Sequence, residues 1–141
     1  MSQLIRHFGL ALILGAALLA SCGSTQTACQ EQVRAYSQQL SPITAEWGTV
    51  TQRASSGAPA DLPPELDTMQ ALRRRTDGVA VPECAKSAHG MLTQSMDMQL
   101  QGFRDTMDNK PAAAIQQEFS TAAQLFASFE NELRRLASPN L

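Results

Sequence analysis

Residues 115–136, IQQEFSTAAQLFASFENELRRL, carry the most regular hydrophobic pattern in this chain. Apolar residues recur there at alternating steps of four and three, at Ile115, Phe119, Ala122, Phe126, Phe129, Leu133 and Leu136. Because an α-helix has about 3.6 residues per turn, this spacing places all of them on one helical face. A helix with one apolar face has to bury that face against other elements. The stretch therefore predicts a long amphipathic helix that belongs to a helical core.

A second stretch with the same spacing lies between residues 29 and 54. Its apolar residues again alternate steps of four and three, at Cys29, Val33, Tyr36, Leu40, Ile43, Trp47, Val50 and Ala54. This pattern predicts another long helix with one apolar face. Pro42 interrupts it, and a proline inside a helix removes one backbone hydrogen bond and clashes with the preceding turn. We therefore expect a kink near residues 38–42, with the apolar face resuming beyond it.

Prolines mark the starts of the remaining helices. Residues 61–65, Asp-Leu-Pro-Pro-Glu, place prolines in the first turn of a short second helix, which Gly78 would cap. Residues 81–84, Val-Pro-Glu-Cys, begin a third helix that continues to about Asp108. The turn at residues 108–111 then leads into the fourth helix.

Together these segments predict an all-α domain over residues 29–137. The sequence beyond residue 21 is rich in Ala, Gln, Ser, Leu and Met and poor in Val, Ile and Tyr, which favours helix over strand. Short connections make successive helices antiparallel, so we expect an up-down-up-down four-helix bundle with a short second helix. In this bundle the first and third helices should enclose Phe126, while Gln124 should face solvent.

The first residues of the chain differ in composition from the rest. Residues 1–7 carry Arg6 and no acid, and residues 8–18 are almost entirely apolar. A charged start and a short apolar core followed by small residues are typical of a secretory signal peptide. The apolar run falls short of the roughly 20 residues that a membrane-spanning helix needs.

The run ends in Leu19-Ala20-Ser21-Cys22. This sequence resembles the lipobox of bacterial lipoproteins, in which an aliphatic residue and two small residues precede a lipidated cysteine. The resemblance implies that residues 1–21 are removed as a signal peptide. It also implies that Cys22 becomes the mature N-terminus, with diacylglycerol on its sulfur and a fatty acyl group such as palmitate on its amine.

Such a lipid anchor would set the location of the protein. Two or more acyl chains hold a protein stably at a membrane. Residues 22–28 would then be a lipidated tether, and the bundle would sit in the cell envelope, facing the periplasm or the exterior. In the enterobacterial sorting pattern, a residue such as Gly23 in place of Asp leaves a lipoprotein free to reach the outer membrane. That rule does not hold for every bacterium, so the choice between inner and outer membrane stays open.

The resemblance also bears on the other two cysteines. An exported chain meets an oxidising compartment, so we expect Cys29 and Cys84 to form a disulfide once Cys22 carries lipid. Both lie at the starts of upward helices and hence at the same end of the predicted bundle. The pairing and the topology therefore support each other. A metal or redox pair is the weaker alternative, because the spacing is not CxxC and no histidine lies near Cys29.

Motifs for enzymatic chemistry are missing from the sequence. It has no GxSxG, no HExxH, no glycine-rich phosphate loop and no CxxCH for haem. We therefore expect neither an enzyme nor a cofactor. The chain has 11 basic and 13 acidic residues, and Arg6 leaves with the signal. A nucleic-acid partner is not expected, because such a partner requires a basic face.

One group of residues raises the possibility of metal binding. His89, Met91, Met96 and Met98 lie close together in the third helix, and imidazole and thioether ligands suit copper(I). Met96 and Met98, however, are about 200° apart on a helix, and methionine at helical spacing more often fills a core. We therefore expect core packing, and His89 and Met91 remain weak metal candidates.

Two classes of function stay open. The first is a non-enzymatic lipoprotein that acts as an interaction or envelope module, with the membrane and an unknown envelope protein as partners. An accessory subunit of an envelope enzyme belongs to the same class. The alternative is a small-ligand or copper-binding protein of the periplasm. An exposed apolar patch would favour the first class, and a large apolar cavity between helices the second.

Overall fold

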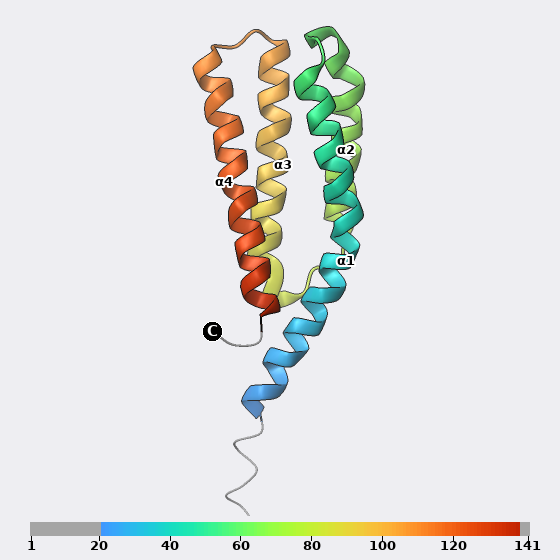
Figure 1. Ribbon diagram of the computed structural model, residues 1–141, viewed down its shortest axis with the longest axis vertical. Helices are drawn as coiled ribbons and strands as arrows, with labels where there is room; N and C mark the ends of the chain where they lie inside the picture. Colours follow the sequence, from blue (N-terminus) through green and yellow to red (C-terminus); the bar gives the residue numbers. More distant parts are fainter. Residues whose placement is uncertain (1–20, 139–141) are drawn as a thin grey trace, which may run out of the picture.

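The computed structural model describes residues 21–138, and this part of the chain consists of helices and the turns between them. The long elements are α1 (Ser21–Ser56), α2 (Leu62–Asp77), α3 (Lys86–Met107) and α4 (Ala112–Ala137). Single 3₁₀ turns, η1 (Pro59–Asp61) and η2 (Glu83–Ala85), precede α2 and α3. The four helices run up, down, up and down, as the sequence predicted (Figure 1).

The helices form two antiparallel pairs that stand side by side (Figure 1). One pair is α1 with α2, and the other is α3 with α4. α2 also packs against α3, whereas α4 makes far more of its contacts with α3 than with α1. The α3–α4 seam is therefore the most closely packed, and the α1–α4 seam is the least closely packed of the four.

A disulfide joins Cys29 to Cys84, with the two sulfurs 2.12 Å and the two Cα atoms 6.3 Å apart. It ties α1 to η2, at the start of the third helix, and so confirms that both cysteines lie at one end of the bundle. The helix α1 begins at Ser21, upstream of this bond, and its first turns project beyond the base of the bundle (Figure 1). Residues 22–28 are thus helical.

Pro42 lies inside α1 without ending it. Its ring is exposed on the outer side of the helix, where the distortion that a proline causes does not disturb packing. The apolar face predicted for this helix stays in register on both sides of the proline. Its residues from Val33 to Ala54 are all buried in the core.

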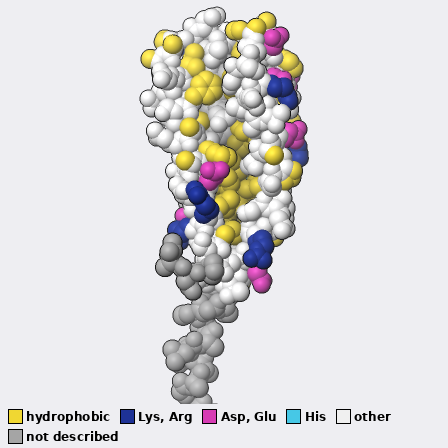
Figure 2. Space-filling view, viewed as in Figure 1, with side chains coloured by type: hydrophobic (Ala, Val, Ile, Leu, Met, Phe, Trp, Pro, Cys, Tyr) yellow, Lys and Arg dark blue, Asp and Glu magenta, His cyan; other side chains and the backbone are white. Residues whose placement is uncertain are grey.

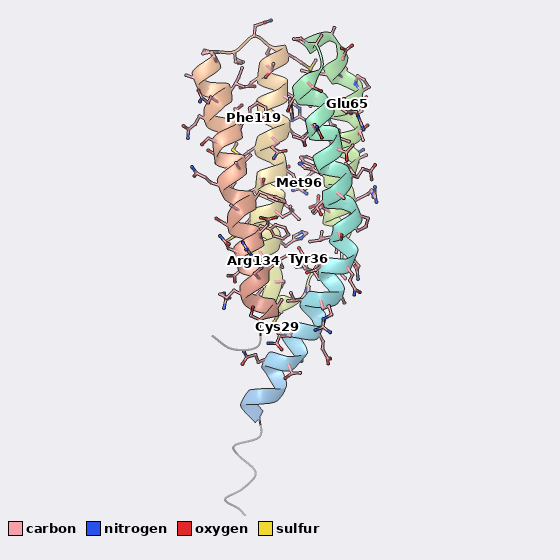
Figure 3. All side chains as sticks on the ribbon, viewed as in Figure 1. Cys29, Tyr36, Glu65, Met96, Phe119 and Arg134 are labelled. Atoms are coloured by element: carbon pink, nitrogen blue, oxygen red, sulfur yellow. A yellow bond between two sulfur atoms is a disulfide. The ribbon has the colours of Figure 1, made fainter. Side chains whose placement is uncertain are left out.

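The core is filled mainly by α1, α2 and α3. Met69 of α2 and Met96 of α3 are almost completely buried, in keeping with the filling role expected for methionine (Figure 3). Thr76 is buried beside them, and its hydroxyl donates to the carbonyl of Leu72 at 3.1 Å, which satisfies a polar group in the core.

The packing of α4 differs from the prediction. Of its apolar face only Ala122 and Phe129 are fully buried, and Phe126 is half-buried. The expectation that α1 and α3 enclose Phe126 is therefore wrong, because α4 leans on α3 and leaves its α1 side uncovered. Gln124 is exposed, as predicted.

Candidate functional site

An open hollow of about 480 Å³ lies between α1 and α4. Figure 2 shows apolar side chains along the middle of this face of the molecule, between the parts formed by the two helices. We call this hollow the α1–α4 groove. From α1 it is lined by Ser37, Leu40, Ser41 and Thr44, and from α4 by Phe126, Phe129, Glu130, Leu133 and Arg134.

The α1 wall of the groove is built from small residues. One position after each core residue of α1 from Tyr36 to Ala54 lies a small side chain, and the series is Ser37, Ser41, Thr44, Gly48, Thr51 and Ser55. We call this series the small-residue stripe. The hydroxyls of Ser37 and Ser41 make no hydrogen bond with the described part of the chain. A Cβ atom added at Gly48 would meet nothing within 4 Å. The wall is therefore shallow and leaves room beside α1.

The α4 wall is apolar and bulky. Phe126 and Leu133 are half-buried and line the groove, while Phe129 forms its inner edge and is only 4% exposed. The rings of Phe126 and Phe129 are 5.7 Å apart and tilted, a packing that aromatic pairs favour. One wall thus offers apolar surface and the other offers space.

Few interactions close this seam. Among the described residues, Arg53 with Glu65 and Arg75 with Glu46 bridge α1 to α2, but no ion pair bridges α1 to α4. The amide of Gln30 donates to the Ser138 carbonyl at 3.1 Å, at the lower end of the seam. The α1–α4 seam thus has fewer polar contacts among the described residues than the α1–α2 seam.

Two arginines mark the lower end of the groove. The Gln30–Ser138 bond aligns the two helices there, so Arg34 of α1 and Arg134 of α4 each lie about one turn above it. The Arg134 guanidinium donates to the Asn131 side chain at 2.6 Å and makes no ion pair among the described residues (Figure 3). Arg34 is exposed and has no hydrogen bond or ion pair in the described structure. The Arg134 guanidinium also donates to the Glu130 carbonyl at 3.4 Å.

A second hollow of about 280 Å³ lies at the opposite end of the bundle, near Ser55 and Phe119. Phe119 packs edge-on against Phe103 of α3, with ring centroids 4.9 Å apart. This contact depends on Gly102, because a Cβ atom there would lie 2.9 Å from the Phe119 ring. We call this space the upper hollow. Because Ser55 also belongs to the small-residue stripe, the stripe reaches from one hollow to the other.

His89 and Met91 are not brought into one site. The His89 ring lies 2.9 Å from the Tyr36 hydroxyl through its Nδ1, and Met91 packs against the core from a half-buried position. Burial lowers the pKa of His89, so a neutral ring can accept a hydrogen bond from the tyrosine hydroxyl. Burial likewise raises the pKa of Tyr36. Across the described residues, no group of three or more His, Cys, Asp or Glu side chains could hold a metal ion.

One acidic side chain stands out near the α3–α4 turn. Oε2 of Glu118 is buried without a hydrogen-bond partner in the described structure. Burial, together with the nearby carboxylate of Asp105, raises the pKa of Glu118. Asp105 is in turn held by the amide of Gln101, at 2.6 Å. This is a local cost of packing α4 on α3, and it lies away from the α1–α4 groove.

The signal peptide and the lipobox lie almost wholly outside the described residues. The structure describes the backbone of Ser21 and Cys22 as the start of α1, but not their side chains. No helix within residues 21–138 is long and apolar enough to cross a membrane. The lipidation of Cys22 therefore remains a prediction from the sequence.

No family model, curated protein or solved structure matches this chain. Its function has to be inferred from its own residues. The α1–α4 groove was missed at the level of sequence, although the small-residue stripe beside the apolar face of α1 was a visible signal. The lining of the groove combines apolar surface, small hydroxyl groups, one guanidinium and one carboxylate.

Proposed function

We propose that this protein is a non-enzymatic, membrane-anchored interaction module that binds a partner in the α1–α4 groove. The observation that carries the proposal is the half-buried apolar face of α4 opposite the small-residue stripe of α1. Apolar surface that lies together in an open groove is typical of a binding surface. Among the described residues, no hydrogen bond joins a hydroxyl of this lining to Glu130, and binding is the role that we propose for the groove.

The position of the groove suits a protein held by lipid at Cys22. α1 starts at Ser21 and enters the bundle at the disulfide end. Lipid on Cys22 would hold that end nearest the membrane and leave the groove open to the aqueous side. Partners in the same membrane, or in the space next to it, could then reach the groove at high local concentration.

A small apolar ligand is the second candidate. The volume of the hollow, about 480 Å³, lies within the range of ordinary ligand sites, which is about 300–1,000 Å³. The groove is nevertheless open along its side, and a ligand site usually buries most of its ligand. The openness favours a macromolecular partner. Copper has less support, because His89 is engaged with Tyr36 and not with a set of thioethers.

Photo-crosslinking in intact envelopes tests the proposal. A photoreactive phenylalanine analogue at position 126 points into the groove, while the same analogue at the exposed position 124 serves as the matched control. We expect a discrete crosslinked species from position 126 and none from position 124. Equal yields from both positions, or none from either, would reject the groove as the binding site.

The anchor is tested separately. With Cys22→Ala, incorporation of radiolabelled palmitate should be lost and unprocessed precursor should accumulate, because no other cysteine follows an apolar core and small residues. Label retained on that variant would show that the lipobox interpretation is mistaken.

A further inference from the structure

We infer that a hollow between α2 and α3 is an anion site that takes a phosphate monoester group, with Arg74 and Arg104 as its main binding residues. This hollow has a volume of about 350 Å³ and lies on a different seam from the α1–α4 groove. Three arginines, two glutamines, one aspartate and one leucine line it, and we call it the α2–α3 hollow. The inference goes beyond the proposed function and does not depend on it.

Two of the arginines in this lining have no partner within the described part of the chain. Arg74 and Arg104 are exposed, and neither side chain makes a hydrogen bond or ion pair there. Arg53 and Arg75, by contrast, each pair with a glutamate of a neighbouring helix. Arg34 is unpaired as well, but it lines none of the hollows described above. The α2–α3 hollow thus brings together two guanidiniums that the fold leaves unpaired.

The carboxylate in the lining is already occupied. Asp97 accepts two hydrogen bonds from the Arg73 guanidinium, at 2.8 and 3.1 Å. Arg73 also pairs with Asp77, and the Arg73 side chain is only 19% exposed. These three groups satisfy one another and form a fixed wall. The attraction that the hollow offers to an anion therefore comes from Arg74 and Arg104.

The two unpaired arginines lean toward each other. The Arg73–Asp97 pair places these two residues at about the same height on the antiparallel helices α2 and α3 (Figure 1). Arg74 is one residue below that height and Arg104 seven residues above it, which is about 12 Å at about 1.5 Å per residue. Side chains tilt toward the N-terminus of their helix, which is the upper end of α2 and the lower end of α3. Both side chains therefore tilt into the space between them, where an anion could meet both.

The number of guanidiniums indicates the class of anion. A guanidinium is a planar fork that can bind two oxygens at once, so one fork is enough for a carboxylate. A phosphate monoester presents three acceptor oxygens and a charge of about −1.5 to −2 at pH 7. It can therefore bind two forks that approach from two helices. This is the arrangement that Arg74 and Arg104 offer.

The rest of the lining suits the same ligand. The carboxamide of Gln70 is half-buried and makes no hydrogen bond within the described residues, so its N–H groups can donate to an anion. Gln101 is engaged, since it donates to Asp105 at 2.6 Å. Leu100 is only 4% exposed and supplies apolar surface in the lining. The volume lies within the range of ordinary ligand sites, about 300–1,000 Å³, and leaves room for the organic group that carries the phosphate.

Protection from phenylglyoxal, which modifies arginine side chains, tests the site residue by residue. The full chain is purified with any lipid that it carries and reconstituted in phosphatidylcholine nanodiscs. It is then modified with and without glycerol 3-phosphate, and peptide mass spectrometry measures the modification of each arginine. A second set of nanodiscs contains phosphatidate, which carries the same phosphate group in a lipid. Acetate at matched ionic strength is the control for a carboxylate and for screening.

We expect glycerol 3-phosphate to protect Arg74 and Arg104 in a saturable manner and to leave Arg34 unprotected. Half-maximal protection should occur at about 1 mM, as two charge-assisted contacts would give. Acetate should protect none of the three. Protection that appears only with phosphatidate would support the same phosphate site and would identify a lipid headgroup as its source.

Single substitutions test whether the two arginines share one ligand. Arg74→Gln should raise the concentration for half-maximal protection of Arg104 about tenfold, and Arg104→Gln should do the same for Arg74, because each removes one guanidinium contact. Arg34→Gln is the matched control and should change neither value. Circular dichroism of the three variants checks that the bundle remains folded.

The contrary outcomes are specific to this site. Equal protection of Arg34, Arg74 and Arg104 would show general screening and overturn the inference. Equal protection by acetate would overturn the choice of a phosphate, and full protection of Arg104 in Arg74→Gln would overturn the shared ligand. If neither glycerol 3-phosphate nor phosphatidate protects Arg74 or Arg104, the α2–α3 hollow is not a phosphate site. The crosslink from position 126 tests the proposed function separately from all of these.

Discussion

At the residue scale, Gly102 shows why α3 and α4 can pack closely. A methyl group at this position would lie 2.9 Å from the Phe119 ring, whereas one at Gly90 would meet nothing within 4 Å. Both glycines lie in the interior of α3, where each costs about 1 kcal/mol relative to alanine. Only Gly102 has a steric reason to be glycine.

We therefore expect opposite effects from the same substitution in α3. Gly90→Ala should raise the free energy of unfolding by about 1 kcal/mol through helix propensity alone. Gly102→Ala should lower it by about 1 kcal/mol, because the cost of displacing the Phe119 ring exceeds the gain in helix propensity. Urea unfolding of the two variants measures both effects. A gain at both positions would mean that α3 and α4 lie farther apart than described.

Glu118 gives a pH-dependent prediction at the same scale. Its pKa is raised by burial and by Asp105, so the native state holds its proton more tightly than the unfolded state does. Stability from this group is fully present below its ordinary value of 4.5 and is lost as the pH rises through the raised pKa.

Glu118→Gln should consequently stabilise the protein at pH 7 and have little effect at pH 3, where the carboxyl is protonated in both states. The urea midpoint at the two pH values measures this difference. Asp105→Asn should reproduce part of the gain at pH 7, because it removes the neighbouring negative charge. A stabilisation that is the same at both pH values would exclude the ionisation of Glu118 as the cause.

At the element scale, α1 carries two parallel tracks with different roles. Leu40 belongs to the core and is 2% exposed, while the next residue, Ser41, is exposed on the groove. One position along the chain turns a side chain by about 100° around the helix. The core track holds the bundle together, and the small-residue stripe leaves the groove open.

Substitutions at these neighbouring positions should separate the two roles. Leu40→Ala should cost about 2–5 kcal/mol of unfolding free energy, as other large-to-small changes in a core do. Ser41→Leu should change it by no more than about 0.5 kcal/mol, because the new side chain enters open space at the surface. Ser41→Leu should nonetheless reduce the yield of the crosslink from position 126. Thermal or urea unfolding that shows a large loss for Ser41→Leu would indicate a closed seam.

The sequence predicted the helices well, but it did not predict how α4 packs against α1. The heptad spacing in α1 and α4 identifies the apolar face of each helix, and the prolines and Gly78 mark where α2 and α3 begin and end. Spacing does not tell which neighbour covers a face. Phe126 and Phe129 are equivalent in the pattern of α4, yet Phe129 is buried and Phe126 is only half-buried. The prediction for Phe126 failed for this reason.

At the scale of the whole molecule, the disulfide fixes the end of the bundle where α1 enters. Cys29 and Cys84 are separated by 55 positions, and the chain-entropy model assigns a crosslink of this span roughly 4 kcal/mol. Cys84→Ser should lower the melting temperature by several degrees, because engineered and native disulfides often contribute less than this limit. Thiol titration of the native protein should find neither cysteine free. Two reactive thiols would show that the native protein lacks this disulfide.

At the scale of the whole molecule, α1 and α4 leave an open groove between them. The most direct test of that groove compares a charge introduced at a groove position of α4 with the same charge at a core position. Phe126→Asp puts a carboxylate in the groove, where water can solvate it, and Phe129→Asp puts the same group in the core. We expect urea unfolding to show a loss of about 1 kcal/mol for Phe126→Asp. Phe129→Asp should lose more than about 4 kcal/mol or fail to fold, since it combines a cavity with a buried charge. Equal and large losses for the two variants would contradict the claim, because they would show that α4 is closed against α1 and that no groove exists.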